Sequence, residues 1–200
     1  ESTASNPDSK DYTTESGHKA VQHFLDEQHR RGGVRATARI KAKNRFTCQW
    51  HIPEKSPSVE LIIPTRDQAE VLNLAVDSII TKTTYTNYTI TVVDNQSEEV
   101  ATKNLFKNLK RVHGEKINII KYNKKFNYSA INNYAVRKST ADIVVLVNND
   151  VEVISSKWLQ EIVSHTSRPD VGCVGAKLYY SNRTIQHGGV VIGIGQVAGH

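Results

Sequence analysis

The chain has 200 residues, of which 38% are hydrophobic and 23% are charged, and its formal net charge is +6 at pH 7. This composition is ordinary for a globular protein with enough chain to bury a substantial core. No apolar run reaches the roughly 18 to 20 residues of a membrane-spanning helix, so we expect a protein that is not integral to a membrane. The positive charge favours a partner that carries phosphate, whether a nucleotide, a nucleic acid or an anionic membrane surface.

Cysteine and methionine usage bears on where the chain works and what it comes from. Cys48 and Cys173 lie far apart and neither has metal-ligand spacing around it. We therefore expect reduced thiols packed as small hydrophobic side chains, in a reducing compartment such as the cytoplasm. No signal peptide opens the chain. It contains no methionine, not even an initiator, so we expect a piece of a longer protein.

The first third of the chain predicts an appendage. Residues 1–16 are polar and lack periodicity, which predicts disorder. A short amphipathic helix is expected at about 18–31, because Val21, Phe24 and Leu25 have helical spacing and Gly32-Gly33 follows as a stop. Residues 34–40 and 45–52 predict a small hairpin, and 53–58 a linker. The expected organisation is disorder over 1–16, a helix and hairpin over 17–57, and the main domain over 58–200.

The main domain opens with a short apolar strand at 59–63, which Pro64 is expected to end. Asp67 followed by Glu70 has the spacing of a helix cap, so a helix should begin there and end near Lys82. The residues expected on its inner face are Val71, Leu74, Ala75 and Ile79.

Strands and helices then alternate to the end of the chain. Strands are predicted at 88–93, 117–120, 143–147 and 171–176, and Ser129 is expected to cap one of the helices between them. The first of these helices carries Leu105, Phe106 and Leu109, the second is expected to direct Ile131, Tyr134 and Ala135 inward, and the third lies around Trp158, Leu159, Ile162 and Val163. Because residues 143–147 are apolar without alternation, we expect a central strand covered on both faces. This order predicts an α/β fold with a mainly parallel, Rossmann-like sheet and helices on both faces. There is no glycine-rich phosphate loop, which argues against a P-loop nucleotidase and a dinucleotide-binding domain.

Carboxylates follow three of the predicted strands: Asp67, Asp94 and Asp150. The carboxyl ends of parallel strands share one edge, so these side chains can line one cleft. We hypothesise that Asp150 holds a divalent metal. Each position also has a purely structural interpretation, since Asp67 can cap its helix and Asp94 and Asp150 can be turn residues.

These residue types suit a nucleoside diphosphate. A carboxylate accepts a hydrogen bond from a pyrimidine ring N–H or from ribose hydroxyls. A hard divalent ion takes oxygen ligands from one or two carboxylates and from the phosphates of the substrate. Lys124, Lys125 and Arg137 can add electrostatic support, but the sequence favours a solvated basic surface as their explanation.

Five segments in order resemble the nucleotide-sugar-dependent glycosyltransferases of family 2, which have the GT-A fold, and within them the bacterial rhamnosyltransferase-like members that build surface polysaccharides such as O-antigen. The resemblance runs from about Val59 to the end of the chain. The segments are Leu61-Ile62-Ile63-Pro64-Thr65-Arg66-Asp67, Val92-Val93-Asp94-Asn95-Gln96-Ser97, Phe126-Asn127-Tyr128-Ser129-Ala130-Ile131-Asn132-Asn133, Leu146-Val147-Asn148-Asn149-Asp150-Val151-Glu152-Val153, and Val174-Gly175-Ala176-Lys177-Leu178 with Gln186-His187-Gly188-Gly189-Val190.

The resemblance implies roles for particular positions. Pro64, Thr65 and Asp67 correspond to the loop beside the nucleoside, and Asp94 to the carboxylate that contacts the base. Asn148-Asn149-Asp150 stands where the family has its Asp-x-Asp metal motif, which implies Asp150 as a ligand of Mn²⁺ or Mg²⁺ and Asn149 as part of the nucleotide-sugar site. Asn148 departs from the family pattern, and an amide is a weaker, neutral ligand. The segment with His187, Gly188 and Gly189 would border the donor sugar or the acceptor, and no chemistry is assigned to it.

The resemblance also implies what the chain acts on. The expected activity is an inverting transfer of a sugar, for example rhamnose, from a UDP- or dTDP-linked donor to a polysaccharide or lipid-linked glycan. No nucleic-acid partner is expected. The expected location is cytoplasmic, with peripheral association at the inner face of the plasma membrane. The family's general base lies beyond the segment that ends at His200, so we expect this piece to bind donor and to be inactive alone.

Two other functions compete with this one. A non-catalytic module that binds a nucleotide sugar or a glycan shares the same donor site. A nucleotidyltransferase of related design is disfavoured, because the first loop has no glycine-rich phosphate grip.

Overall fold

The structure, a computed structural model, describes residues 12–193 and 198–199 and falls into two compact units. The N-terminal unit comprises Glu1–Glu54 with Ser164–Gly175, and the sheet unit comprises Lys55–Val163 with Ala176–His200. Within the described residues, no helix combines the length and apolar character needed to span a bilayer.

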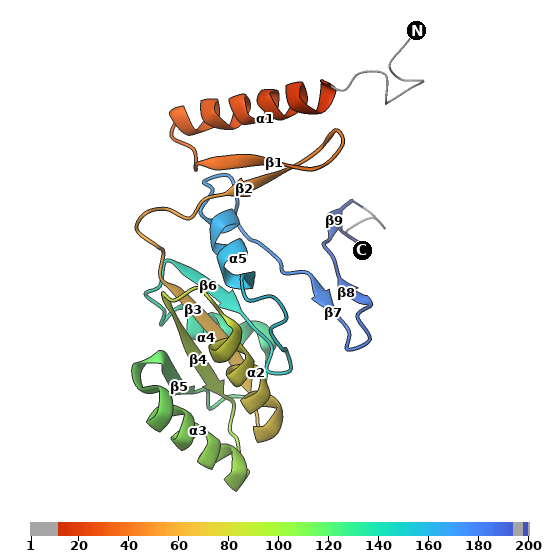
Figure 1. Ribbon diagram of the computed structural model, residues 1–200. Helices are drawn as coiled ribbons and strands as arrows, with labels where there is room; N and C mark the ends of the chain where they lie inside the picture. Colours follow the sequence, from red (N-terminus) through yellow and green to blue (C-terminus); the bar gives the residue numbers. More distant parts are fainter. Residues whose placement is uncertain (1–11, 194–197, 200) are drawn as a thin grey trace. The chain divides into compact units, whose positions relative to one another are not determined.

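The N-terminal unit is a helix packed on a two-stranded hairpin (Figure 1). Helix α1 (Thr13–Arg30) ends at the predicted glycine stop, where the Gly32 N–H donates to the carbonyl of His29 at 2.9 Å and Gly32 has a φ of 91°. Strands β1 (Ala36–Ala42) and β2 (Arg45–Trp50) pair antiparallel, which confirms the predicted hairpin.

Two expectations for this region are wrong. The helix begins at Thr13, so residues 13–16 are helical and not disordered; the same prediction for residues 1–11 lies outside the described residues. Cys48 and Cys173 are free thiols, as expected, but both are exposed and do not pack as core side chains. Cys48 of β2 lies opposite Ala38, but α1 packs on Ala36 and Ala38 of β1 and leaves Cys48 exposed.

The sheet unit is built on four parallel strands in the order β5-β4-β3-β6, which confirms the α/β fold (Figure 1). Strands β3, β4 and β5 pair in register through Ile62, Thr91 and their neighbours, and β6 pairs with β3 only from Val59↔Ile143 to Ile62↔Leu146. The strands are β3 (Val59–Thr65), β4 (Tyr88–Asp94), β5 (Ile117–Lys121) and β6 (Ile143–Leu146). Strand β3 runs through Pro64 and is not broken there, because β6 no longer pairs with β3 at that point and no N–H is needed on that side.

Helices connect these strands as crossovers. Right-handed connections place α2 and α3 on one face of the sheet, and α4, which follows the reversal in strand order, on the other. The helices are α2 (Ala69–Lys82), α3 (Val100–His113), α4 (Tyr128–Val136) and α5 (Trp158–Thr166), with a short 3₁₀ helix η1 (Gly114–Lys116) before β5. Val71 and Leu74 were expected on the inner face of α2 but are 37% and 56% exposed; Leu72, Ala75, Val76 and Ile79 are buried there.

The core beneath α4 is a cluster in which Ile62 and Val93 of the sheet meet Ile131 and Ala135 of α4 and Tyr122 after β5. Each of these side chains is at most 6% exposed. This packing fixes the beginning of α4, and therefore the loop before it, against the carboxyl ends of β3 and β4.

Strand β6 is an edge strand, so the expectation of a central strand covered on both faces is wrong. Val144 and Leu146 are 36% and 48% exposed, because they share the face of the sheet on which α4 packs and α4 covers β3 and β4. At its beginning β6 is tied to β3 by Asp142, whose carboxylate accepts the Ser58 N–H and hydroxyl, both at 2.8 Å. These hydrogen bonds lower the pKa of Asp142.

The chain beyond α5 differs from the prediction. Residues 171–176 form no strand; short antiparallel pairs follow instead, β7 (Leu178–Tyr179) with β8 (Ile185–His187) and β9 (Val191–Ile192) with β10 (Ala198–Gly199). Residues 171–175 are exposed or half-buried, so an apolar run here did not produce a buried strand.

Candidate functional site: a cavity at the carboxyl edge of the sheet

The carboxyl ends of β3, β4 and β6 meet at one edge of the sheet. Thr65, the last residue of β3, lies opposite Asp94, the last residue of β4. The Asn149 side-chain amide, three residues after β6, donates to the Thr65 hydroxyl at 3.1 Å. The segments that carry Asp94 and Asp150 therefore come together at the edge where open α/β sheets bind ligands.

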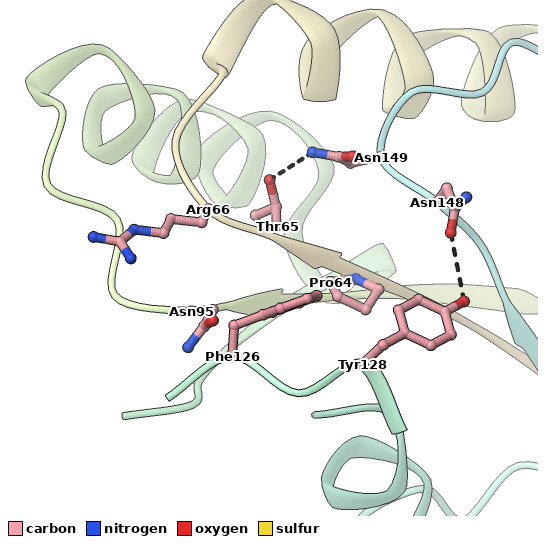
Figure 2. A pocket seen from close by; sticks show the side chains of 8 residues that line it. All are labelled: Pro64, Thr65, Arg66, Asn95, Phe126, Tyr128, Asn148 and Asn149. Atoms are coloured by element: carbon pink, nitrogen blue, oxygen red, sulfur yellow. Dashed lines mark hydrogen bonds between the residues drawn. The ribbon is translucent and has the colours of Figure 1, made fainter. Parts of the chain in front are cut away.

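A cavity of about 290 Å³ opens at this edge. Figure 2 shows its walls, in which the Tyr128 hydroxyl points to Asn148 and the Asn149 amide points to the Thr65 hydroxyl. Among the described residues, its lining consists of Pro64, Thr65, Arg66, Asn95, Phe126, Tyr128, Asn148 and Asn149. The wall combines aromatic and aliphatic surface with amide and hydroxyl groups, a composition typical of small-molecule sites.

The loop after β6 is held on both sides of Asp150. Before it, Asn149 is bound to Thr65, and Asn148 accepts a long 3.4 Å hydrogen bond from the Tyr128 hydroxyl (Figure 2). After it, the Val153 N–H donates to the Ser78 hydroxyl of α2 at 3.1 Å. Asp150 itself is exposed. The carboxylate is thus presented to solvent from a backbone that both neighbouring segments position.

Asp94 is buried, with 9% of its surface exposed, and is not among the residues that line the cavity. Its Oδ1 accepts the Ser97 N–H at 2.9 Å, so the predicted turn role is real. Asn95, the next residue, points its side-chain N–H to the carbonyls of Tyr122 and Lys124, at 3.0 and 2.8 Å. Asn95 therefore holds the chain leaving β5 beside the cavity.

Asp67 does not cap the helix that follows it. Its Oδ1 accepts the N–H groups of Glu98 and Glu99, at 2.8 and 2.9 Å, and its own N–H donates to the Ser97 hydroxyl at 2.9 Å. The residue before α2 is Gln68, which makes no side-chain cap. Because Asp67 has a left-handed backbone, with a φ of 55°, its side chain reaches across to the loop before α3 and joins the two loops.

We expect Asp67→Ala to destabilise the sheet unit by about 2 kcal/mol, because two backbone donors lose a charged acceptor and alanine is strained at a positive φ. Asp67→Asn keeps an acceptor oxygen and tolerates this backbone, so it should cost less than about 1 kcal/mol. Urea unfolding of the three proteins measures the difference. Equal losses of stability in the two variants would contradict the conclusion that the Asp67 carboxylate joins the two loops.

The donor set around Asp150 fits a metal that arrives with a substrate phosphate. Within the described residues, no group of three or more His, Cys, Asp or Glu side chains is close enough to hold an ion alone. Mg²⁺ is commonly bound by one or two carboxylates together with substrate phosphates. One exposed carboxylate, with the Asn148 amide two residues before it, matches that arrangement.

Some of the predicted site residues line the cavity and others do not. Pro64, Thr65 and Asn149 line the cavity, whereas Asp67, Asp94 and Asp150 lie outside its lining. Lys124, Lys125 and Arg137 are exposed.

Sequence reasoning gave no role to four lining residues: Arg66, Asn95, Phe126 and Tyr128. Two aromatic residues in an otherwise polar loop were the signal that could have found this wall. Ser129 was expected to cap α4, but the cap is Asn127, whose Oδ1 accepts the Ala130 N–H at 2.9 Å.

Comparison with known proteins agrees with this geometry. The model of glycosyl transferase family 2 matches residues 60–193. The uncharacterized protein y4gI of Sinorhizobium fredii is 43% identical over 208 residues, which cover 100% of this chain and 22% of that protein. The O-antigen biosynthesis protein RfbC of Myxococcus xanthus is 33% identical over 190 residues, which cover 95% of this chain and 14% of that protein. The chain thus spans less than a quarter of either relative.

Solved structures share the fold at low identity. A mannosyltransferase from Pyrobaculum calidifontis in complex with GDP-Man and Mn²⁺ aligns with a TM-score of 0.54 and 18% identity over 80% of this chain and 43% of the other. GalNAc-T7 with UDP, GalNAc and Mn²⁺ aligns with a TM-score of 0.54 and 17% identity over 60% of this chain and 23% of the other. These likenesses establish a GT-A architecture. Because the family match covers well over half of its residues, the chain belongs to glycosyl transferase family 2.

Proposed function

We propose that this chain binds the donor of a glycosyl transfer, a nucleoside diphosphate sugar, in the cavity at the carboxyl edge of the sheet. The observation that carries the proposal is the meeting of Thr65, Asn95 and Asn149 around that cavity, with Asp94 and Asp150 in the same segments. Family membership and the ligands of the two solved transferases support it.

The proposed activity of the whole protein is an inverting transfer of a hexose or deoxyhexose, such as rhamnose, to a polysaccharide or lipid-linked acceptor. The similarity to an O-antigen biosynthesis protein supports the acceptor class. The residues of this chain are assigned to donor binding: Pro64, Thr65, Asp94 and Asn149 to the nucleotide sugar, and Asp150 to the metal.

A divalent ion, Mn²⁺ or Mg²⁺, would be held by Asp150 and would neutralise charge on the diphosphate. Asp67 takes a positioning role in the proposal, because its carboxylate holds the two loops behind Thr65 and Asp94 together.

Titration calorimetry tests the proposal directly. UDP and dTDP should bind more tightly with Mn²⁺ than without it, because the single carboxylate needs the diphosphate to complete the metal site. Equal affinity with and without the metal would remove the proposed role of Asp150. Failure of all nucleoside diphosphates to bind would remove the proposed function.

The base contact proposed for Asp94 has a sharper test. Because Oδ1 accepts the Ser97 N–H, an asparagine at this position would keep that bond with its amide oxygen and turn its NH₂ group outward. We expect Asp94→Asn to lose affinity for UDP by at least about tenfold, since a uracil N3–H would face another donor. The loss should be smaller for CDP, whose N3 is an acceptor. An unchanged ratio of UDP to CDP affinity in calorimetry would contradict the contact.

A further inference from the structure

One of the two strongly basic stretches of the chain covers the hairpin. Residues 28–53 contain seven Lys and Arg residues and no Asp or Glu. The whole chain has 26 basic and 20 acidic residues, so the charge outside this stretch sums to −1. Residues 103–125 of the sheet unit carry a similar excess, with eight Lys and Arg residues and one Glu, so what distinguishes residues 28–53 is the absence of any acidic residue.

The hairpin presents this charge on a surface that α1 leaves open. Ala36 and Ala38 of β1 pack with Leu25 of α1, and the β1 backbone is bound by the Gln22 side chain, which donates to the Ala36 carbonyl at 3.2 Å and accepts the Ala38 N–H at 2.8 Å. Side chains alternate along a strand, so Arg39 and its cross-strand partner Thr47 belong to the opposite face.

Further basic residues surround the turn of the hairpin. Lys41 lies at the irregularity in the pairing between Ile40 and Ala42, and Arg45 opens β2; both side chains are exposed. In the described part of the chain, no carboxylate forms an ion pair with Arg35, Arg39, Lys41 or Arg45. By contrast, Arg30 and Arg31, at the end of α1, are both within ion-pair distance of Glu27. These four cations of the hairpin region therefore have no ion-pair partner among the described residues.

We propose that the β1–β2 hairpin binds the surface of an anionic lipid bilayer through Arg35, Arg39, Lys41 and Arg45. Clusters of four to eight basic residues beside an anionic leaflet are attracted to its lipid headgroups. This surface belongs to the N-terminal unit and makes no use of the donor cavity.

The side chains of the hairpin favour a lipid surface over single-stranded nucleic acid. Proteins that bind single strands stack bases on aromatic side chains beside the basic groups. The aromatic residues of this hairpin are engaged elsewhere: Phe46 lies 6.3 Å from the His18 ring of α1, and Trp50 packs with the Leu25 cluster and lies 4.2 Å from the Arg168 guanidinium. The open face of the hairpin carries Thr37, Arg39, Thr47 and Gln49, which offer charge and hydrogen bonds without a stacking platform.

Vesicle co-sedimentation at about 0.1 M salt tests the proposal, because charge attraction at a surface is still felt across the Debye length of about 10 Å. The protein should sediment with vesicles of phosphatidylcholine and phosphatidylglycerol and not with phosphatidylcholine alone. The variant R39Q/K41Q/R45Q should bind the anionic vesicles about a hundredfold more weakly, since each basic residue near such a surface contributes about fivefold.

The matched control K107Q/R111Q/K157Q removes the same charge from exposed positions of the sheet unit and should bind as the unchanged protein does. R39K/R45K, which keeps the charge, should also retain binding. Equal losses in the two glutamine triples, or no loss in either, would overturn the proposal. So would tighter binding to a short duplex DNA than to anionic vesicles at the same salt, lost in R39Q/K41Q/R45Q. UDP affinity should be the same in all variants, which separates this test from the proposed function.

Discussion

Asp150→Ala should abolish the effect of Mn²⁺ on nucleotide binding. In the proposed site Asp150 supplies the one carboxylate of the metal, and within the described residues no neighbouring cluster of His, Cys, Asp or Glu can replace it. A metal that bridges protein and diphosphate contributes several kcal/mol, so UDP affinity in Mn²⁺ should fall on the order of a hundredfold. Without metal, the variant and the unchanged protein should bind UDP equally weakly. Calorimetry in Mn²⁺ and in a chelator measures both values.

Glu152→Ala is the matched control for this experiment. It removes the same charge two residues away, from a side chain that forms an exposed ion pair with Lys82 at 2.6 Å. Exposed pairs contribute at most about 1 kcal/mol, and Glu152 has no proposed ligand role, so the metal effect should persist. If Asp150→Ala keeps its metal dependence, or if Glu152→Ala loses it equally, Asp150 is not the metal ligand.

Ile62→Ala should be the most damaging single substitution in the core. Ile62 is fully buried in β3 between β4 and β6 and contacts Ile131 and Ala135 of α4 through the cluster beneath that helix. Truncation leaves a cavity that the paired backbone cannot fill, with an expected cost of roughly 2 to 5 kcal/mol. That is a large part of the roughly 5 to 15 kcal/mol that stabilises a typical domain. Urea unfolding followed by circular dichroism measures the change.

Ile154→Ala provides the comparison for this loss. Ile154 is 76% exposed, so the same truncation should change stability by no more than about 0.5 kcal/mol. Similar losses at the two positions would mean that β3 is not the centre of the folded unit. A cost below about 1 kcal/mol at Ile62 alone would mean that α4 collapses onto the smaller side chain.

Hydrophobic pattern predicted the strands and helices, because burial depends on local sequence. The mainly apolar segments at β3 and β4 correspond to strands in which nearly every side chain is buried. The same reasoning failed for β6, whose Val144 and Leu146 are no less apolar but are half exposed. Position within a sheet depends on pairing with distant segments, and the composition of one strand does not encode it.

The roles of site residues were predicted wrongly or missed where a side chain forms hydrogen bonds with a loop distant in the sequence. Asp67 and Glu70 have the spacing of a cap, but the Asp67 carboxylate binds the loop before α3, about 30 residues along the chain, because of its left-handed backbone. The role of Asn95 could not be predicted for the same reason, since its hydrogen-bond partners are carbonyls of the chain leaving β5. Residue type and spacing predicted which edge of the sheet carries the polar groups; the partners of each group depend on the tertiary fold.

Pro64 lacks a backbone N–H at the point where β3 and β6 separate to form the cavity. The Ile62 carbonyl accepts the Val147 N–H at 2.9 Å, so even-numbered residues of β3 direct their backbone groups toward β6. The next such residue is Pro64, where the two strands have already separated. Any other amino acid would place an amide proton at the fork that no backbone acceptor of β6 matches. Proline lets the two strands separate without leaving such a donor. The Pro64 carbonyl remains at the fork and can accept a hydrogen bond from a ligand that carries a donor.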